Sequence, residues 1–147
     1  MAGMLGLGRQ FNIVGTASGV GINMRDYSSI GIYGTNDGTY TLTLSTSFAG
    51  SYTQPSGWNP ITVKYTNSDN GAGTGAWTKV TQSASNAVVT ATDIAVYFEL
   101  YTSQVPDTYD YVTVTKTSAN DGNPSCLVIL HDLSVQRAPA ALGIVSA

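Results

Sequence analysis

The chain has 147 residues and a formal net charge of −3, and charged residues make up only 10% of it. Thr, Ser and Gly account for 50 of the 147 residues, whereas Lys and Glu, which usually cover a solvated helix, number three and one. This composition excludes coiled coils and helical bundles, and it indicates a single all-β domain. The few basic residues are scattered along the chain, which excludes nucleic-acid binding by phosphate neutralisation, so we expect no nucleic-acid partner.

The N-terminal residues 1–28 are rich in Gly and Ala and weakly patterned. Each glycine disfavours a helix by about 1 kcal/mol relative to Ala, so we expect an extended arm with one short strand near Phe11–Val14. The segment lacks the basic and apolar regions of a signal peptide. No apolar run approaches the ~20 residues of a membrane helix. These features predict a protein made in a cytoplasm, with no membrane partner.

Residues 29–136 show the period-two alternation of β-strands. In Thr39–Phe48, apolar side chains occupy one face and hydroxyl side chains the other, which predicts a half-buried strand with a hydroxyl-rich outer surface. The same alternation recurs in three further segments: Ile61–Tyr65, Ile94–Tyr101 and Tyr109–Lys116. Cys126–Leu133 is apolar enough throughout to predict a central strand covered on both faces.

Turn residues that tolerate positive φ separate these strands, as in Asn36-Asp37-Gly38 and in the Gly-rich loop after Asp69. Short strands divided by such turns predict an antiparallel β-sandwich or a jelly roll. Residues 137–147 contain Pro139 and small apolar side chains, and we expect a C-terminal arm there. The predicted organisation is therefore an N-terminal arm (1–28), a β-sandwich (29–136) and a C-terminal arm (137–147).

Residues suited to catalysis or metal binding are scarce. His131 is the only histidine and Cys126 the only cysteine, so no zinc spacing and no internal disulfide are possible. We expect Cys126 to be a buried small hydrophobe. A carboxylate pair would have to combine Glu99 with Asp93 or Asp110, yet Asp in turn-like segments usually bonds its own backbone. The sequence therefore predicts no enzyme, no catalytic residue, no metal and no cofactor.

Aromatic side chains are the more informative group, with nine Tyr and two Trp. Such side chains serve as contact surfaces in protein interfaces and as stacking platforms for sugars. Trp58 and Trp77 flank Gly- and Ser-rich segments. Four tyrosines fall in two strands and form a cluster if those strands are neighbours: Tyr97, Tyr101, Tyr109 and Tyr111. One functional hypothesis is therefore a carbohydrate-binding or adhesin-like module, carried on a virion or elsewhere, with Trp58, Trp77 and exposed tyrosines as its platform.

A second hypothesis comes from the order of the predicted strands. A strand with Gly75, Trp77, Thr78 and Val80 is followed by Ile94–Tyr101, by a strand with Tyr109, Tyr111, Val112 and Val114, and by the apolar Leu127–Leu130. Over roughly Thr39 to Val135 this succession resembles the small β-sandwich capsid decoration (cement) proteins of tailed bacteriophages. The Gly-rich first 28 residues depart from that pattern.

The resemblance implies a structural virion protein on the outside of an assembled bacteriophage capsid, made in the host cytoplasm. Its implied partners are the major capsid protein and its own copies, commonly as a homotrimer. The apolar arms would then lie across neighbouring subunits and bury apolar surface or add strands to them. The candidate partner-binding residues are Phe11, Ile13 and Val14 in the first arm and Ala141, Leu142, Ile144 and Val145 in the last.

Overall fold

The computed structural model describes residues 13–17, 21–35, 38–69, 74–92, 94–117 and 125–131. Over these residues the chain is built from strands and two short 3₁₀ helices, η1 (Met24–Asp26) and η2 (Thr102–Gln104). The strands are β1 (Ile13–Ala17), β2 (Ile22–Asn23), β3 (Ser29–Gly34), β4 (Gly38–Ser45), β5 (Ile61–Asn67), β6 (Trp77–Asn86), β7 (Val88–Ala91), β8 (Ala95–Tyr101), β9 (Tyr111–Thr117) and β10 (Ser125–His131).

These strands form a large sheet in the order β1-β10-β3-β8-β5-β6 and a small sheet in the order β2-β9-β4-β7. Apart from the β5–β6 hairpin, early strands pair with late ones: β1 with β10, β2 with β9, β3 with β8 and β4 with β7, all antiparallel. Such pairing describes one long antiparallel ribbon rolled into two layers, which is the jelly-roll arrangement. The predicted all-β sandwich is confirmed, and its strand order is that of a jelly roll.

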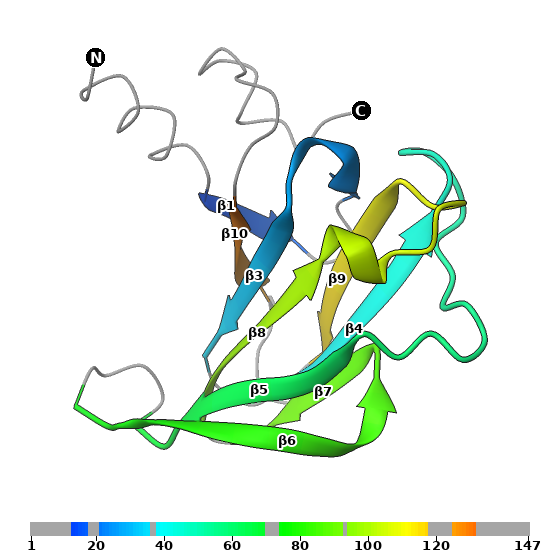
Figure 1. The fold of residues 1–147 in the computed structure, drawn as a ribbon. Helices are drawn as coiled ribbons and strands as arrows, with labels where there is room; N and C mark the ends of the chain where they lie inside the picture. The colour runs from blue at the N-terminus through cyan, green and yellow to red at the C-terminus, as the bar shows by residue number, and fades with distance from the viewer. Residues whose placement is uncertain are drawn as a thin grey trace, which may run out of the picture.

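The β5–β6 hairpin is inserted between β4 and β7 and extends the large sheet beyond β8, along the lower side of the view in Figure 1. Side chains fix the loop of this hairpin. Asn67 Nδ2 donates to the carbonyl oxygen of Gly75 at 2.8 Å, and the Asp69 carboxylate accepts the backbone N–H of Thr74 at 3.1 Å. Strands β5 and β6 thus form a hairpin, and the Asp69 carboxylate bonds to Thr74 on the other side of its turn.

The core lies between the two sheets. Strand β8 shows the pattern, because Val96, Phe98 and Leu100 are buried while Tyr97 and Tyr101 point away from the core. The ring of Phe98 meets that of Tyr40 in β4 edge to face, with 5.9 Å between centroids, so this pair joins the large sheet to the small one. Cys126 is 6% exposed, which confirms the prediction of a buried cysteine.

Three expectations about the strands need correction. Strand β1 overlaps the short strand expected near Phe11–Val14, but the N-terminal arm is shorter than 28 residues, because β1 and β2 pair within the sandwich and Ile22 is fully buried. Strand pairing with β10 and β9 orders these short strands, and their own sequence is too brief to show a pattern. Strand β10 is not covered on both faces, since Leu127 on its outer face is 43% exposed. Finally, β5 does not keep Ile61 and Tyr65 on one buried face, since Ile61 is buried and Tyr65 is 39% exposed.

Candidate functional site

A continuous row of side chains crosses the outer face of the large sheet. Leu127 of β10 lies opposite Tyr33 of β3, and Tyr33 lies opposite Tyr97 of β8. Tyr97 in turn lies opposite Tyr65 of β5, which lies opposite Lys79 of β6. Because directly opposed residues share a face of a sheet, the row places three tyrosines side by side across the middle strands.

Trp77, the first residue of β6, completes an aromatic cluster with this row. Its ring lies 6.2 Å from that of Tyr33, tilted by 59°, and the rings of Tyr65 and Tyr97 lie 6.5 Å apart, tilted by 44°. Together with Glu99 these four residues line a hollow of about 430 Å³, here called the aromatic groove. Trp77 is 47% exposed and Tyr65 is 39% exposed, so much of the ring surface faces solvent.

Glu99, the only glutamate of the chain, is the acidic group of the aromatic groove. Its Oε1 accepts a hydrogen bond from the Tyr97 hydroxyl and its Oε2 one from the Tyr101 hydroxyl, both at 2.7 Å. Partial burial raises the pKa of the Glu99 carboxyl, but these two hydrogen bonds and the nearby His131 outweigh burial and hold the pKa below its usual value. Glu99 is therefore an anion at neutral pH.

Tyr97 occupies the centre of the site. Burial and the hydrogen bond to Glu99 raise the pKa of its hydroxyl far above the ordinary value, so the phenol stays neutral. The same hydroxyl lies 3.3 Å from His131 Nε2 on β10. The Tyr97 ring reaches His131 across Gly31, where a Cβ would come within 2.9 Å of Tyr97 Cε2 and within 3.0 Å of His131 Nε2. Glycine at position 31 therefore allows the ring to lie against the strand.

A second hollow adjoins the aromatic groove and shares Tyr65 and Glu99 with it. It has a volume of about 220 Å³ and is more polar. Its other lining residues are Pro60, Thr62, Val63, Lys79, Tyr101 and Gln104. Gln104 is held in place at this end, since its Nε2 donates to the carbonyl oxygen of Pro60 and its Oε1 accepts from the Tyr101 backbone N–H. We call this second hollow the polar groove.

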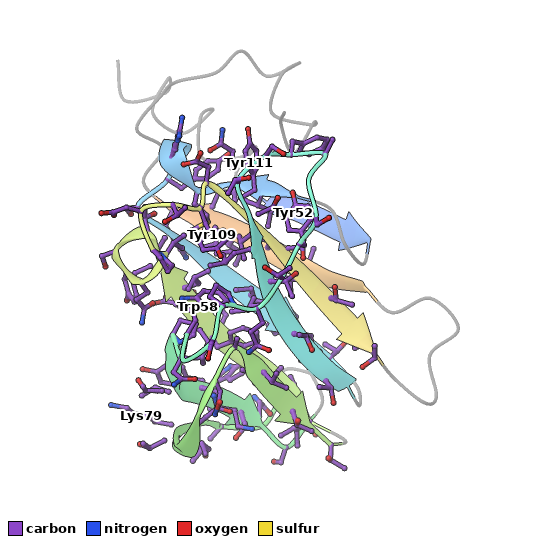
Figure 2. The ribbon with its side chains drawn as sticks, turned by 90° about the vertical axis from the view of Figure 1, so that its right-hand side faces the viewer. Tyr52, Trp58, Lys79, Tyr109 and Tyr111 are labelled. Carbon is purple, nitrogen blue, oxygen red and sulfur yellow. The ribbon has the colours of Figure 1, made fainter. Side chains whose placement is uncertain are left out.

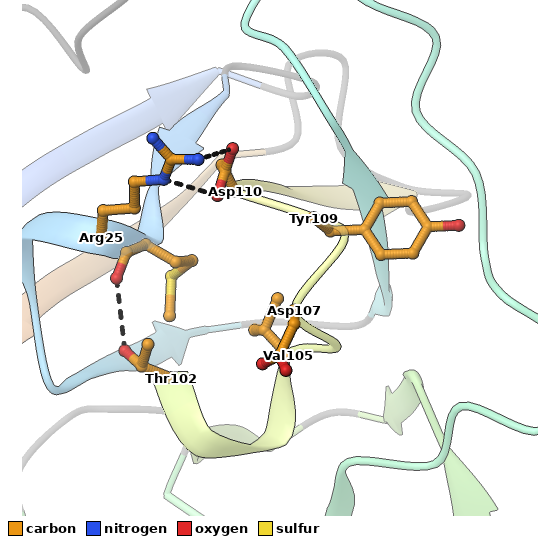
Figure 3. A pocket seen from close by; sticks show the side chains of 7 residues that line it. Arg25, Thr102, Val105, Asp107, Tyr109 and Asp110 are labelled. Atoms are coloured by element: carbon orange, nitrogen blue, oxygen red, sulfur yellow. Dashed lines mark hydrogen bonds and ion pairs between the residues drawn. The ribbon is translucent and has the colours of Figure 1, made fainter.

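A third hollow of about 190 Å³ lies elsewhere, between η1, η2 and the segment that enters β9 (Figure 3). Arg25 and Asp110 lie side by side in its lining and form a two-point ion pair with N–O distances of 2.6 and 2.5 Å. Because the Arg25 side chain is 70% exposed, this pair contributes only about 0.2–1 kcal/mol to stability. Because Arg25 and Asp110 pair with each other, neither presents its full charge to a ligand in this hollow.

The two tryptophans have different roles. Trp58 is 8% exposed and its indole Nε1 donates to the carbonyl oxygen of Gln104 at 2.7 Å, so it is a core residue and cannot stack on a ligand. Only Trp77 reaches the site. Tyr109 and Tyr111 are at the opposite end of the molecule from Lys79 (Figure 2). Tyr111 begins β9 in the small sheet, so the expected cluster with Tyr97 and Tyr101 of β8 does not form.

Sequence reasoning missed Tyr33 and Tyr65. Tyr33 belongs to β3, whose alternation is hidden because Ser29 and Gly31 take the other outward positions. Tyr65 shares its sequence alternation with Ile61 and Val63, which predicts a position on the buried face, but it lies opposite Tyr97 of β8 on the outer face and is 39% exposed. For Tyr33, the available signal is an aromatic residue out of phase with the core positions Ile30 and Ile32 of its strand.

Most of the predicted partner-binding residues lie outside the part of the chain that the structure describes: Phe11, Ala141, Leu142, Ile144 and Val145. Ile13 and Val14 belong to β1, where they lie opposite Ile129 and Val128 of β10. They are therefore part of the sandwich edge rather than of a free arm.

Other functional groups are widely separated. Glu99 is on the outer face of the large sheet, whereas Asp110 precedes β9 and is bound by Arg25. Within the described ranges, no three His, Cys, Asp or Glu side chains come together as metal ligands would. The described residues also include no helix long and apolar enough to cross a membrane. Comparison of the chain with known protein families, with curated proteins and with solved structures gives no match.

Proposed function

We propose that this chain is a structural virion protein that binds the outside of an assembled bacteriophage capsid as a decoration protein, with its own copies as further partners. The observation that carries the proposal is where the two chain ends join the sandwich. Ile13, which begins β1, lies opposite Ile129, and β10 ends two residues later at His131. Residues 1–12 and 132–147 are therefore attached at the same corner of the large sheet.

The composition of these two segments suits adhesion to another protein. Residues 1–12 carry one charged side chain, Arg9, and residues 132–147 carry two, Asp132 and Arg137. At about 3.3 Å per residue, the sixteen C-terminal residues can reach as far as about 50 Å. Segments of this length and polarity favour binding across a boundary between neighbouring subunits, where both can act from one attachment point.

The adjoining edge of the sandwich offers two further means of attachment. Strand β1 is the outermost strand of the large sheet, so its outer edge has no partner among the described strands and can accept an added one. Leu127, opposite Gly15 of β1, presents an exposed apolar side chain beside that edge. Apolar surface next to an open strand edge is typical of a protein interface.

The experiment measures how many copies of the protein bind to capsids (heads) of the phage that encodes it, when those heads have been assembled without the protein. Removing residues 138–147 is expected to reduce occupancy strongly while the far-ultraviolet circular dichroism of the free protein is unchanged. Leu127→Ser is expected to weaken attachment, whereas Val88→Ser, a similarly exposed apolar residue on β7 of the other sheet, is not. Unchanged occupancy of the truncated protein would sink the proposal.

Light scattering after size exclusion provides an independent measurement. We expect a stable homotrimer, with three times the chain mass of 15.3 kDa. A trimer can attach at several points at once, which strengthens its binding to the capsid. A protein that is monomeric at every concentration and also fails to occupy heads would contradict both parts of the proposal.

A further inference from the structure

Beyond attachment to a capsid, we propose that the outer face of the large sheet binds an uncharged oligosaccharide, which lies along the aromatic groove and the polar groove. The sugar rings stack on Trp77 and the neighbouring tyrosines, and their hydroxyl groups bond to Glu99. The stacking residues Trp77 and Tyr65 lie on β6 and β5, away from the β1 edge, while His131 at the end of β10 reaches the Tyr97 hydroxyl of the site at 3.3 Å.

The aromatic groove has the size and surface for such a ligand. Its volume of about 430 Å³ falls in the range of small-molecule sites. Trp77 is 47% exposed and Tyr65 39% exposed, which leaves ring surface open to a ligand. The face of a sugar ring consists of C–H groups, and these pack on an aromatic face while the hydroxyls remain at the edge. Trp77 and Tyr65 are the most exposed of these rings and are the stacking surfaces.

Glu99 supplies the polar recognition at the centre of the site. An ionised carboxylate offers about four acceptor positions, and the hydroxyls of Tyr97 and Tyr101 occupy one on each oxygen. The remaining positions can accept hydrogen bonds from two ligand hydroxyls. Since both hollows include Glu99 and Tyr65 in their lining, a single chain of two or more sugar units can contact both at once.

The charge pattern selects among ligand classes. Anionic Glu99 repels carboxylated and sulfated sugars, because like charges at close range are strongly unfavourable. A wholly apolar ligand would strip water from Glu99 without replacing its hydrogen bonds. A cationic ligand would be attracted to Glu99 and repelled by Lys79 in the polar groove, and an acidic sugar would meet the reverse, so neither charge suits both residues. An uncharged ligand rich in hydroxyl groups satisfies every part of the site.

The site is also rigid before any ligand arrives. The residues of the aromatic groove come from four neighbouring strands, β3, β8, β5 and β6, rather than from loops. The hydrogen bonds from Tyr97 and Tyr101 fix the Glu99 carboxylate in position. Side chains that are already ordered lose little conformational entropy on binding, which favours a ligand with many weak contacts.

The test is calorimetric titration of the full chain with uncharged trisaccharides of gluco, manno and galacto configuration, with acidic trisaccharides, and with tetramethylammonium. At least one uncharged sugar is expected to bind, and the acidic sugars and tetramethylammonium are not. Trp77→Ala and, separately, Tyr65→Ala are expected to weaken binding by about tenfold or more, as for removal of a central aromatic contact. The control is Phe48→Ala, since Phe48 is 37% exposed but lies after β4 of the small sheet.

Two further readouts make the outcome decisive. Glu99→Gln is expected to weaken uncharged sugars and to relieve the exclusion of acidic ones, which a purely apolar contact would not produce. Denaturation midpoints of all variants identify any variant that loses binding because it unfolds. Since Trp77→Ala and Tyr65→Ala are separate variants, one still tests the site if the other unfolds. Tighter binding of tetramethylammonium than of any sugar, or equal binding by the Trp77 and Phe48 variants, overturns the proposal. Neither result bears on attachment to heads, which is assigned to the β1 edge, to Leu127 and to the segments joined to β1 and β10.

Discussion

The two outer faces of the sandwich cover the same core with very different residues. On the small sheet, β4 presents Thr39, Thr41 and Thr43 outward, and Thr43 lies opposite Thr113 of β9 with their hydroxyl oxygens 2.7 Å apart. On the large sheet, the corresponding outward positions carry Tyr97 and Tyr65. One face is thus short and hydroxylated, and the other is broad and aromatic.

The difference shows which face is explained by folding alone. Threonine is favoured on the solvent side of a strand because its branched side chain suits the pleat and its hydroxyl bonds to a neighbour or to water. Tyrosine and tryptophan also suit a strand, but a Trp77 that is 47% exposed retains ring surface that the fold does not bury. Exposed aromatic surface gathered in a groove is typical of a binding site. The small sheet therefore has the surface of a structural layer, and the large sheet has that of a recognition surface.

The largest expected effect comes from making the same substitution at the two tryptophans. Trp58→Ala removes a buried ring and leaves the carbonyl of Gln104 without its donor, so it is expected to lower the free energy of unfolding by about 3–5 kcal/mol. Trp77→Ala is expected to lower it by about 1 kcal/mol or less, because the ring is half exposed. Urea denaturation measures both values. Equal losses would mean that Trp77 is needed for the fold and that the contrast between the faces is wrong.

A smaller effect is expected from alkaline pH, and Tyr97 of the aromatic face contributes to it. The folded protein raises the pKa of Tyr97 above its ordinary value of 10.0, through burial and the hydrogen bond to Glu99. The associated stability is fully present below pH 10 and is lost as the pH rises through the folded-state pKa. Wild type is therefore expected to lose more stability above pH 10 than Tyr97→Phe, in denaturation series across that range. Parallel curves for the two proteins would contradict this assignment.

The smallest effect is expected on the threonine face. The hydroxyl contact between Thr43 and Thr113 is partly buried, and cross-strand pairs of this kind contribute about 0.2–1 kcal/mol. A double-mutant cycle with Thr43→Val and Thr113→Val, followed by denaturation, should give a coupling energy in that range. Because valine keeps the branched shape, the strands are expected to remain paired. A coupling of several kcal/mol would show that this face stabilises the fold far more than a simple covering layer does.

Much of the fold was predictable, because alternation along a strand is a local property. The buried set Tyr40, Leu42 and Leu44 and the outward threonines between them follow directly from the order of residues in Thr39–Phe48. The same holds for β8, where Phe98 is buried and Glu99 faces outward. The low charge and the abundant Thr, Ser and Gly also excluded a helical protein, because helix and strand preferences are local properties of single residues.

Strand neighbours, in contrast, were decided by the tertiary structure. Tyr97 and Tyr111 lie in segments of similar sequence character, yet the rolling of the ribbon sends one to the large sheet and the other to the small one. Tyr65 reaches the aromatic groove because the pairing of β5 with β8 sets it opposite Tyr97, although its own alternation groups it with Ile61 and Val63. The sequence by itself determined which residues alternate and how little charge they carry. The grouping of Tyr33, Tyr65, Trp77 and Tyr97 around Glu99 depends on pairing between strands far apart in the chain, which only the folded structure specifies.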